Sequence, residues 1–404
     1  MKYTPEEVMQ YVREAEVKFI RLAFCDAFGN QKNVAIMADE LERAFAYGVG
    51  IDTSAIGGFG GEVRSDLLLH PDPSTLIQLP WRSEQGKVAR MFCDVAYPDG
   101  TPFAGDTRQI LKQAVAAAAA RGYAFSFGAE MEFDLFKLDE QGRPTKLPYD
   151  DASYMDSEPD DRGESVRREI CLMLEQMDIH PESAHHESGP GQNEIDFRYA
   201  DPLTAADQAV TFYAAVKTVA AANGLAADFS PKPILDRDGN GMHINISARG
   251  AGQPDPLPQV IAGILAQASA MTVFLNPCEN SYDRLGYHKA PAYITWSREN
   301  RSQLIRIPAA VGEYRRAELR SPDPAANPYL AFALVIYAGL QGIEQQLTPP
   351  PAADFNIFTA PLEVLASYHK LPTSLHEARA IAAASPFIRA HLSELVIDAY
   401  CNDR

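Results

Sequence analysis

The spacing of apolar residues in the first hundred positions changes between a helical period and a strand period. The string Thr4-Pro5-Glu6-Glu7 has the form of a capping box with proline at the first helical position, so it predicts the start of a helix. The apolar runs that follow are separated by turn residues such as Phe28-Gly29-Asn30. The pattern predicts a small α+β unit with, in order, a helix over 4–15, strands over 17–25 and 34–37, a helix over 39–47, and a glycine-rich loop with short strands over 49–81.

Beyond residue 105 the pattern indicates a second, larger unit. The loop-rich stretch 97–105 separates two predicted domains, 1–102 and 103–404, in agreement with a length well above that of one typical domain. Short strands, and no βαβ repeats, lie between the helices, so the pattern favours the α+β class with an antiparallel sheet. Capped helices are predicted over 106–121, 161–177 and 202–223.

Four short strands of the second unit carry polar residues at every second position, which places those residues on one face of a sheet. In GAEMEFDLF, the acidic residues Glu130, Glu132 and Asp134 alternate with apolar ones. Two such carboxylates lie about 6.6 Å apart and repel by about 2.5 kcal/mol at an effective dielectric of about 20, so something positive should offset them. The other polar sets are Glu194, Asp196 and Arg198 after Glu187; His243, Asn245 and Ser247; and Arg316, Glu318 and Arg320.

On one strand, solvent could compensate these charges, because polar-out alternation is common on antiparallel sheets. Four such strands with apolar flanks favour a site for divalent cations. Carboxylate oxygens with a single histidine suit Mg²⁺ or Mn²⁺ better than zinc. A cluster of arginines without any lysine follows within residues 298–320, namely Arg298, Arg301, Arg306, Arg315, Arg316 and Arg320. Because guanidinium groups match phosphate geometry, we infer a site for a metal-bound nucleotide triphosphate and phosphoryl transfer, without a Walker A loop.

Composition narrows the possible partners. With 54 acidic and 36 basic residues the chain has a net charge of −18, so neither nucleic acid nor an anionic membrane is expected as a partner. The charged N-terminal segment differs from a signal peptide and no run of ~18 apolar residues occurs, so a cytoplasmic location is expected. The five cysteines form no CxxC pair, and we expect them to be reduced packing residues.

Six strings, in order through nearly the whole chain, resemble motifs of glutamine synthetase of the bacterial, dodecameric class. They are GAEMEF (128–133), HHESGPGQNEI (185–195), GMHINIS (241–247), NSYDRL (280–285), NRSQLIRIP (300–308) and RAELRSPDPAANPYLA (316–331); SDLLLHPDPST (65–75) resembles the family's first-domain signature. The resemblance implies a small β-grasp N-terminal domain and a catalytic domain with a curved antiparallel sheet. It also implies a homo-oligomer, a hexameric ring or a dodecamer, with active sites between neighbouring subunits.

The resemblance also assigns roles to single residues. It implies an ATP-dependent ligase that forms an acyl phosphate on glutamate and then an amide with a nitrogen nucleophile. Two or three Mg²⁺ or Mn²⁺ ions would be held by Glu132, Glu187 and Glu194 and by Glu130, His243 and Glu318. ATP would contact Phe197, Tyr199, Ser247 and Arg316, and its β- and γ-phosphates would contact Arg301 and Arg306. Arg320 would hold the transferring phosphoryl group or the side-chain carboxylate of glutamate. Glutamate would contact Arg284 and Gly239, and the nucleophile would contact Tyr154 and Asp52, the latter as the anionic group that takes its proton.

Several positions depart from the family's pattern. The segment Leu285–Pro291, which closes over the substrate in the family, is about one residue shorter here and has His288 or Lys289 where the family has a glutamate that helps bind ammonium. The reversed charge should weaken ammonium binding, unless Glu279 or Glu299 serves instead. The other departures are Ala55 for a serine, Asp238 for an asparagine, Asn245 for a second histidine, Phe358 for the tyrosine that enterobacterial members adenylylate, and an end at Arg404 short of the family's usual C-terminal extension.

Three functions fit these observations. The leading hypothesis is a ligase that joins the side-chain carboxylate of glutamate, or of a close analogue, to an amine other than ammonia, or to ammonia inefficiently, with Lys289 near the nucleophile. The second is an ordinary glutamine synthetase that uses ammonia. The third is a catalytically silent member that binds nucleotide or amino acid as a sensor or scaffold. The complete set of acidic ligands disfavours the third, because buried acids without a metal would be costly.

Overall fold

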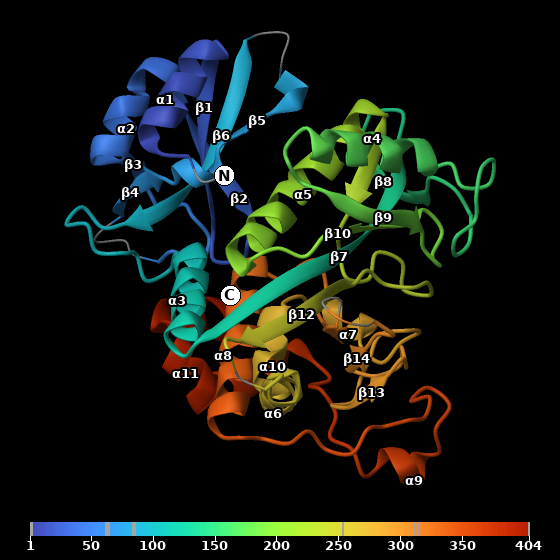
Figure 1. Cartoon of the computed structure of the whole chain (residues 1–404). Coiled ribbons are helices and arrows are strands. Elements are labelled where there is room, and N and C mark those ends of the chain that lie inside the picture. The colour runs from blue at the N-terminus through green and yellow to red at the C-terminus, as the bar shows by residue number, and fades with distance from the viewer. Residues whose placement is uncertain are drawn as a thin grey trace.

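The computed structural model describes residues 3–60, 65–82, 86–252, 254–310, 312 and 315–402. Its N-terminal part is a mixed sheet with two helices beside it (Figure 1). The strand order is β2-β1-β6-β4-β3 with β5 added on β6, and only β1 and β6 run parallel among these pairs. The elements are α1 (Pro5–Glu14), β1 (Val17–Cys25), β2 (Gln31–Met37), α2 (Leu41–Tyr47), β3 (Val49–Asp52), β4 (Asp66–Pro71), β5 (Ile77–Gln78) and β6 (Lys87–Ala96).

Local sequence explains where these elements begin. The Thr4 hydroxyl accepts the N–H of Glu7 at 3.2 Å and the Glu7 carboxylate accepts the N–H of Thr4 at 2.7 Å, so the predicted capping box is present at α1. The small α+β unit predicted from the apolar pattern is confirmed. A short 3-10 turn, Ala38–Glu40, precedes α2 where one longer helix was predicted. Residues 61–64 of the predicted glycine-rich loop lie outside the described residues.

The larger part of the chain is built on a second sheet, with strand order β13-β14-β15-β12-β7-β10-β9 and with β8 and β11 on β7. Its pairs are antiparallel, as predicted, except for the short parallel pair β13 and β14. The strands are β7 (Tyr123–Leu138), β8 (Pro144–Pro148), β9 (Pro181–His186), β10 (Gln192–Phe197), β11 (Leu225–Asp228), β12 (Met242–Gly250), β13 (Trp296–Arg298), β14 (Ile305–Ile307) and β15 (Ala317–Leu319).

Helices cover this sheet on the side away from its charged residues. In Figure 1, β7 crosses the molecule, with α5 above it and the bundle of α3, α6, α8 and α10 below. Phe133 of β7 packs edge-to-face on Phe212 of α5, with ring centroids 5.9 Å apart. The helices are α3 (Thr107–Ala120), α4 (Glu164–Glu175), α5 (Pro202–Ala222), α6 (Leu257–Leu275), α7 (Ser281–Arg284), α8 (Pro328–Glu344), α9 (Leu362–Leu365), α10 (Leu375–Ala384), α11 (Pro386–His391) and α12 (Glu394–Cys401).

The helices α6 and α8 touch backbone to backbone. A Cβ atom at Gly263 would lie 2.0 Å from the carbonyl oxygen of Ala338, and one at Gly342 would lie 2.0 Å from that of Gln259. Helix α6 is long and apolar enough to cross a membrane, although polar residues interrupt its apolar sequence, and most of it is buried in the core. Two of the five free cysteines, Cys25 and Cys93, are also buried.

The predicted cap of the helix over 161–177 is wrong. Helix α4 begins at Glu164, and its N-cap residue, Gly163, provides no side-chain hydrogen bond. Asp161, the predicted start, instead forms a buried ion pair with Arg167, which also donates to Asn193 at 2.5 Å. The carboxylate therefore fixes α4 against β10 and does not cap the helix.

A buried cluster of charges joins the two parts of the chain. Arg108, at the start of α3, has a side chain only 4% exposed. Its guanidinium lies 2.9 Å from Asp72 and 3.0 Å from Asp94, which both belong to the N-terminal sheet region, and 3.0 Å from Asp207 of α5. Lys112 adds a second cation next to Asp94, at 2.6 Å. The contact surface between the two parts is therefore held by ion pairs around the buried Arg108, with Asp94 and Lys112 partly exposed.

Candidate active site

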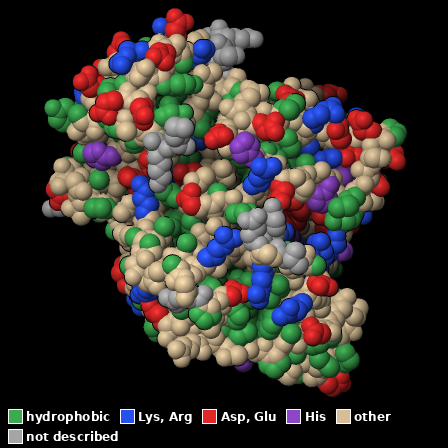
Figure 2. All heavy atoms as spheres, viewed as in Figure 1, with side chains coloured by type: hydrophobic (Ala, Val, Ile, Leu, Met, Phe, Trp, Pro, Cys, Tyr) green, Lys and Arg blue, Asp and Glu red, His purple; other side chains and the backbone are tan. Residues whose placement is uncertain are grey.

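A cavity of about 550 Å³ opens between the charged face of the second sheet and the segment that follows α7. Figure 2 shows basic side chains over the middle and lower right of this face, next to acidic and histidine side chains. Most of the predicted site residues line the cavity: Glu130, Glu132, Tyr154, Glu187, Glu194, Gly239, His243, Arg284, Lys289, Arg301, Arg306, Arg316 and Arg320. Four segments far apart in sequence are thus brought together, as the alternation of polar residues predicted.

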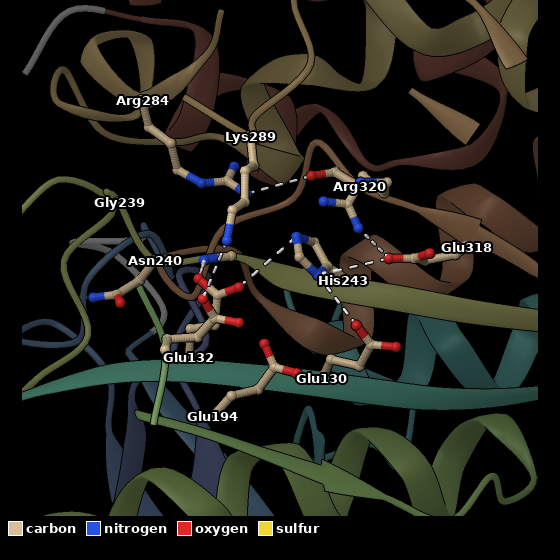
Figure 3. Close-up of polar contacts among 12 residues, drawn as sticks. Glu130, Glu132, Glu194, Gly239, Asn240, His243, Arg284, Lys289, Glu318 and Arg320 are labelled. Carbon is tan, nitrogen blue, oxygen red and sulfur yellow. Dashed lines mark hydrogen bonds and ion pairs between the residues drawn. The ribbon is translucent and has the colours of Figure 1, made fainter. Parts of the chain in front are cut away.

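Strand register explains why the acids meet. In the antiparallel pairs, Glu194 of β10 lies opposite Glu132 of β7, and His243 of β12 lies opposite Glu130 of β7. Directly opposed residues on one face have Cβ atoms about 4.5–5.5 Å apart, so their side chains share one space. Figure 3 shows these side chains pointing toward one another above β7.

One predicted set of metal ligands forms a compact group. Glu130, His243 and Glu318 have potential ligand atoms that all lie within 4.8 Å of one another. His243 Nδ1 is 3.2 Å from Glu130 Oε2 and 3.8 Å from Glu318 Oε1. The geometry therefore suits one cation held by two carboxylates and an imidazole.

The other predicted set is arranged differently. Glu132, Glu187 and Glu194 line the same cavity, but they fall into two overlapping groups, Glu132–Glu194–His243 and His185–Glu187–Glu194. His185 was not predicted from the sequence, although it lies on β9 directly opposite Glu194 of β10. Glu194 also meets Glu130 and Asp196, so it is common to three groups of potential ligands among the described residues.

The charges of these acids are poorly balanced by the protein alone. Burial, together with the neighbouring carboxylates of Asp196, Glu132, Glu130 and Glu187, raises the pKa of Glu194 well above its usual value. Burial and the Glu130 carboxylate also raise the pKa of Asp196 to about 6. Asp196 Oδ1 is buried without a hydrogen-bond partner. An unpartnered acid oxygen among crowded carboxylates fits the binding of hard divalent cations, which would favour the ionised forms.

Two other acids, Glu187 and Glu130, are held ionised by neighbouring side chains. Burial opposes ionisation of Glu187, but the contacts of His185 and Lys289 outweigh it and lower the pKa of Glu187 to about 2. In the same way, the hydrogen bond and charge of His243 overcome burial and lower the pKa of Glu130 to about 2. The cavity thus contains acids of both kinds, some stabilised by neighbours and some that lack a counter-ion.

Glu318 connects the metal-ligand groups to the arginines. It is fully buried, lies 2.7 Å from Arg306 Nη1 and forms a second ion pair with Arg320. The Nε atoms of Arg306 and Arg320 are buried and have no hydrogen-bond partner. Arg298 and Arg315 of the predicted cluster do not line this cavity, and Arg315 pairs with Asp255 at 2.6 Å. Four of the six arginines, Arg301, Arg306, Arg316 and Arg320, therefore line the cavity.

The predicted nucleotide contacts form a second cavity of about 310 Å³ beside the first. Phe197, Tyr199, Ser247 and Arg316 all line it, and Glu130, Ser183, Asp196 and Arg316 line both cavities. Arg316 Nε donates to Asn245 Oδ1 at 2.8 Å, and Asn245 Nδ2 donates to Glu130 at 2.8 Å. The two cavities are therefore joined by residues that contact both, in the order expected for a nucleotide base and its phosphates.

The predicted glutamate contacts lie at the opposite end of the main cavity. The buried Arg284 donates to the carbonyl oxygen of Ser321 at 2.7 Å. Gly239 is held by Gln192, whose amide donates to the Gly239 carbonyl at 3.1 Å and to Asn240 Oδ1 at 3.0 Å. Asn240 in turn donates to Asp134 at 2.7 Å. Gln192 and Asn240 were not predicted, although Gln192 shares its strand face with Glu194.

The segment that closes the cavity contacts both of its walls. Lys289 Nζ donates to Ser188, lies 3.7 Å from Glu187 Oε2 and is 4.9 Å from the ring centroid of Tyr154. On the other wall, His288 Nδ1 is 3.0 Å from Asp238. Figure 3 shows Lys289 reaching into the site from above. The extra carboxylate of Asp238 therefore has the imidazole of His288 as its neighbour.

The two glutamates that could replace the ammonium-binding glutamate of the family do not line this cavity. Neither Glu279 nor Glu299 is among the residues around it, and Glu299 lies beside β14 with its N–H bound to the Ile307 carbonyl at 3.0 Å. Within the described residues, the segment 285–291 therefore places a basic residue, Lys289, at the cavity where the family has a glutamate.

Asp52 is the one predicted catalytic residue that does not reach the cavity of its own chain. It is exposed at the end of β3 in the N-terminal sheet, and Ala55 is exposed close by. The backbone N–H and the hydroxyl of Ser54 bond its carboxylate and lower its pKa. A role for Asp52 requires the site of a neighbouring subunit, which stays a prediction.

Comparison with known proteins defines the class. The catalytic-domain model of glutamine synthetase matches residues 104–404, and the β-grasp-domain model of glutamine synthetase matches residues 16–98. The chain therefore belongs to the glutamine synthetase family, and the predicted fold, a β-grasp domain followed by the catalytic domain, is confirmed. It is an ATP-dependent ligase of glutamate, as predicted; the identity of its nitrogen nucleophile is left open.

Individual relatives are similar over almost the full chain. Glutamine synthetase of Clostridium saccharobutylicum is 46% identical over 393 residues, which cover 93% of this chain and 88% of the relative. Glutamine synthetase of Methanosarcina mazei is 45% identical, with 98% and 92% covered. Among solved structures, a GmaS complex with ADP has a TM-score of 0.88 at 30% identity and covers 98% of this chain and 94% of its own. Ligand-free GmaS has a TM-score of 0.87 at 31% identity, with 97% and 93% covered.

Proposed function

We propose that the protein uses ATP and two or three Mg²⁺ or Mn²⁺ ions to join the side-chain carboxylate of glutamate to an amine in preference to ammonia. The observation that carries this proposal is the position of Lys289, whose ammonium group lies beside Glu187 and Tyr154 at the predicted nucleophile pocket. A fixed positive charge there repels an ammonium ion. A neutral or larger amine avoids part of this repulsion.

The residues around the cavity support each step of such a reaction. Bound divalent ions would neutralise the charge that develops on the γ-phosphoryl oxygens. Arg306 and Arg320, with their unpartnered Nε atoms, would orient the phosphates, and Arg284 would hold the α-carboxylate of glutamate. The segment 285–291 would exclude water from the acyl phosphate. The amine would then displace phosphate and form the amide.

The proposal includes assembly. We propose that the N-terminal domain, residues 1–102, of one subunit completes the cavity formed by residues 103–404 of its neighbour, with Asp52 as the anionic group that takes the proton of the amine. The exposure of Asp52 and its separation from the cavity of its own chain support this arrangement. A hexameric ring or a dodecamer and a cytoplasmic location are part of the same proposal.

Reversing the charge of Lys289 tests the preference for an amine over ammonia. We expect Lys289→Glu to lower the KM for ammonium by about tenfold or more, because an attraction replaces a repulsion at a distance of about 5 Å, weakened by solvent around this half-exposed side chain. Phosphate release dependent on ATP and glutamate measures it. The matched control is Lys370→Glu, since Lys370 also lies over a tyrosine ring, that of Tyr293, at 5.3 Å, but does not line the cavity. If the wild-type enzyme prefers ammonia to every amine tested, the proposal is wrong and the protein is an ordinary glutamine synthetase.

The glutamate contact has its own expected result. Arg284→Lys keeps the positive charge but loses the planar pair of donors, so the KM for glutamate should rise about 100-fold while the KM for ATP stays within twofold. Steady-state kinetics with each substrate varied in turn measures both values. Arg143→Lys is the control, because Arg143 lies on the surface beside Asp139. A KM for glutamate within threefold of the wild type would remove Arg284 from the substrate site.

A further inference from the structure

The ammonium group of Lys289 has the surroundings that a bound substrate cation would need. Its three donors face the Ser188 hydroxyl and the Glu187 carboxylate, and the group lies over the face of the Tyr154 ring. The ring of His185 packs edge-to-face on Tyr154 with centroids 5.3 Å apart, and Arg301 lies close enough to act on Tyr154 electrostatically. Carboxylate, hydroxyl and aromatic face together form a cation subsite, and a side chain of the enzyme already occupies it.

A cationic amine would therefore meet two disadvantages. It would compete with Lys289 for Glu187, Ser188 and Tyr154, and it would be repelled by the lysine that it displaces. His288, the other basic residue of the segment, is paired with Asp238 and offers no compensation. An amine without a charge meets neither disadvantage.

Three large, partly exposed side chains with apolar surface also line the same cavity. Tyr154, Met155 and Tyr287 line it with 43%, 62% and 57% of their surfaces exposed, and all three are large hydrophobic side chains. Met155 adopts a left-handed backbone conformation, with φ of 60°, and its N–H is bound to the His186 carbonyl at 3.0 Å. Backbone strain of this kind persists where the surroundings fix it, and Met155 is one of the residues that line the cavity. These side chains favour an apolar or aromatic substituent on the substrate.

Resting on the proposed ligase function, we propose that the amine substrate is weakly basic, uncharged at neutral pH, and carries an aromatic or similarly apolar substituent. The lone pair of such an amine is free without prior removal of a proton. It attacks the side-chain carbonyl carbon of γ-glutamyl phosphate, so that a C–N bond forms and the C–O bond to phosphate breaks. Phosphate leaves with the electron pair, and the nitrogen releases one proton to a carboxylate. ATP, glutamate and the amine yield ADP, phosphate and the γ-glutamyl amide.

Two amines of the same ring size separate charge from shape. Aniline is uncharged at neutral pH, whereas cyclohexylamine is a cation. With the full-length enzyme, ATP, Mg²⁺ and glutamate, we expect kcat/KM for aniline to exceed that for cyclohexylamine at least tenfold, with most of the difference in KM. Phosphate release gives the rates, and mass spectrometry of the γ-glutamyl amide shows which amine was used.

Variants show whether Lys289 causes the preference. Lys289→Met should reduce the ratio between the two KM values to about threefold or less, whereas Lys370→Met should leave it unchanged. This inference would be overturned if the wild-type enzyme turned over cyclohexylamine as well as or better than aniline, or did not turn over aniline. The proposed amine ligase would still hold in that case if another amine were preferred to ammonia. Preference for ammonia over both amines and over other amines would overturn the proposed function itself.

Discussion

Replacing Glu318 by glutamine is expected to lower ligase activity by roughly 10³-fold. Glu318 is fully buried, and its two oxygens face Arg306 and Arg320 while His243 lies 3.8 Å away. Glutamine keeps the shape, but its NH₂ group turns donors toward a guanidinium and removes the negative charge that a divalent cation requires. Losing a charge at the point where phosphoryl transfer is stabilised costs about 10²–10³-fold for one group, and more when two arginines are also disturbed.

The measurement is phosphate release over a titration of Mg²⁺, because weaker metal binding would shift the midpoint as well as lower the maximum. Glu363→Gln is the matched control, since Glu363 is exposed on α9 and lies outside both cavities. Far-ultraviolet circular dichroism establishes that the variant is folded. If a folded Glu318→Gln enzyme retains more than a tenth of wild-type activity, Glu318 is neither a metal ligand nor an anchor of the arginines.

Arg108→Met is expected to destabilise the protein by about 3–5 kcal/mol. The substitution keeps the volume and the apolar stem but leaves the carboxylates of Asp72, Asp94 and Asp207 close together without their shared cation. Removing one partner of a buried ion pair is costly because the remaining charge stays desolvated. Lys112 compensates only part of this loss, since it lies 2.6 Å from Asp94 but 3.6 Å from Asp72.

Urea unfolding followed by tryptophan fluorescence suits this test, because Trp81 of the N-terminal part packs against the core shared by the two parts and Trp296 lies in the catalytic part. Arg143→Met provides the comparison, since Arg143 forms an exposed ion pair with Asp139 that is worth at most about 1 kcal/mol. Equal shifts of the unfolding midpoint for the two variants would show that the buried cluster does not hold the two parts together.

The sequence predicted best where a local pattern was strong. The capping box at Thr4, the strand Val17–Cys25 and the helix opened by Asp201-Pro202 all appear in the structure within a residue or two. The helix over 161–177 was less well predicted, because the tertiary contact of Asp161 with Arg167 overrides its local preference for a cap. The parallel pair β13 and β14 also escaped prediction, since short strands carry no signal for their direction.

The candidate site was predicted through the alternation of polar residues on strands, and this limits what could be found. Glu130, Glu194, His243 and Glu318 lie on strands and converge as expected. Ser188 lies in the turn after β9, where alternation gives no information, whereas His185 lies on β9 opposite Glu194 and was missed because the polar alternation was followed only from Glu187 onward. The contact between Lys289 and Glu187 depends on how a loop folds back over the sheet, which no spacing along the chain specifies.

The contact between α6 and α8 limits how this enzyme can diversify. Gly263 and Gly342 leave no room for any side chain between the two helices. The helices α6 and α8 lie beneath the catalytic sheet. Because the distance between them is fixed by this close contact, they form a rigid support for the sheet. New substrate preferences are therefore expected to arise in the loops above the sheet. A single exchange there, such as glutamate to lysine, changes the charge of the pocket without affecting the packing of α6 on α8.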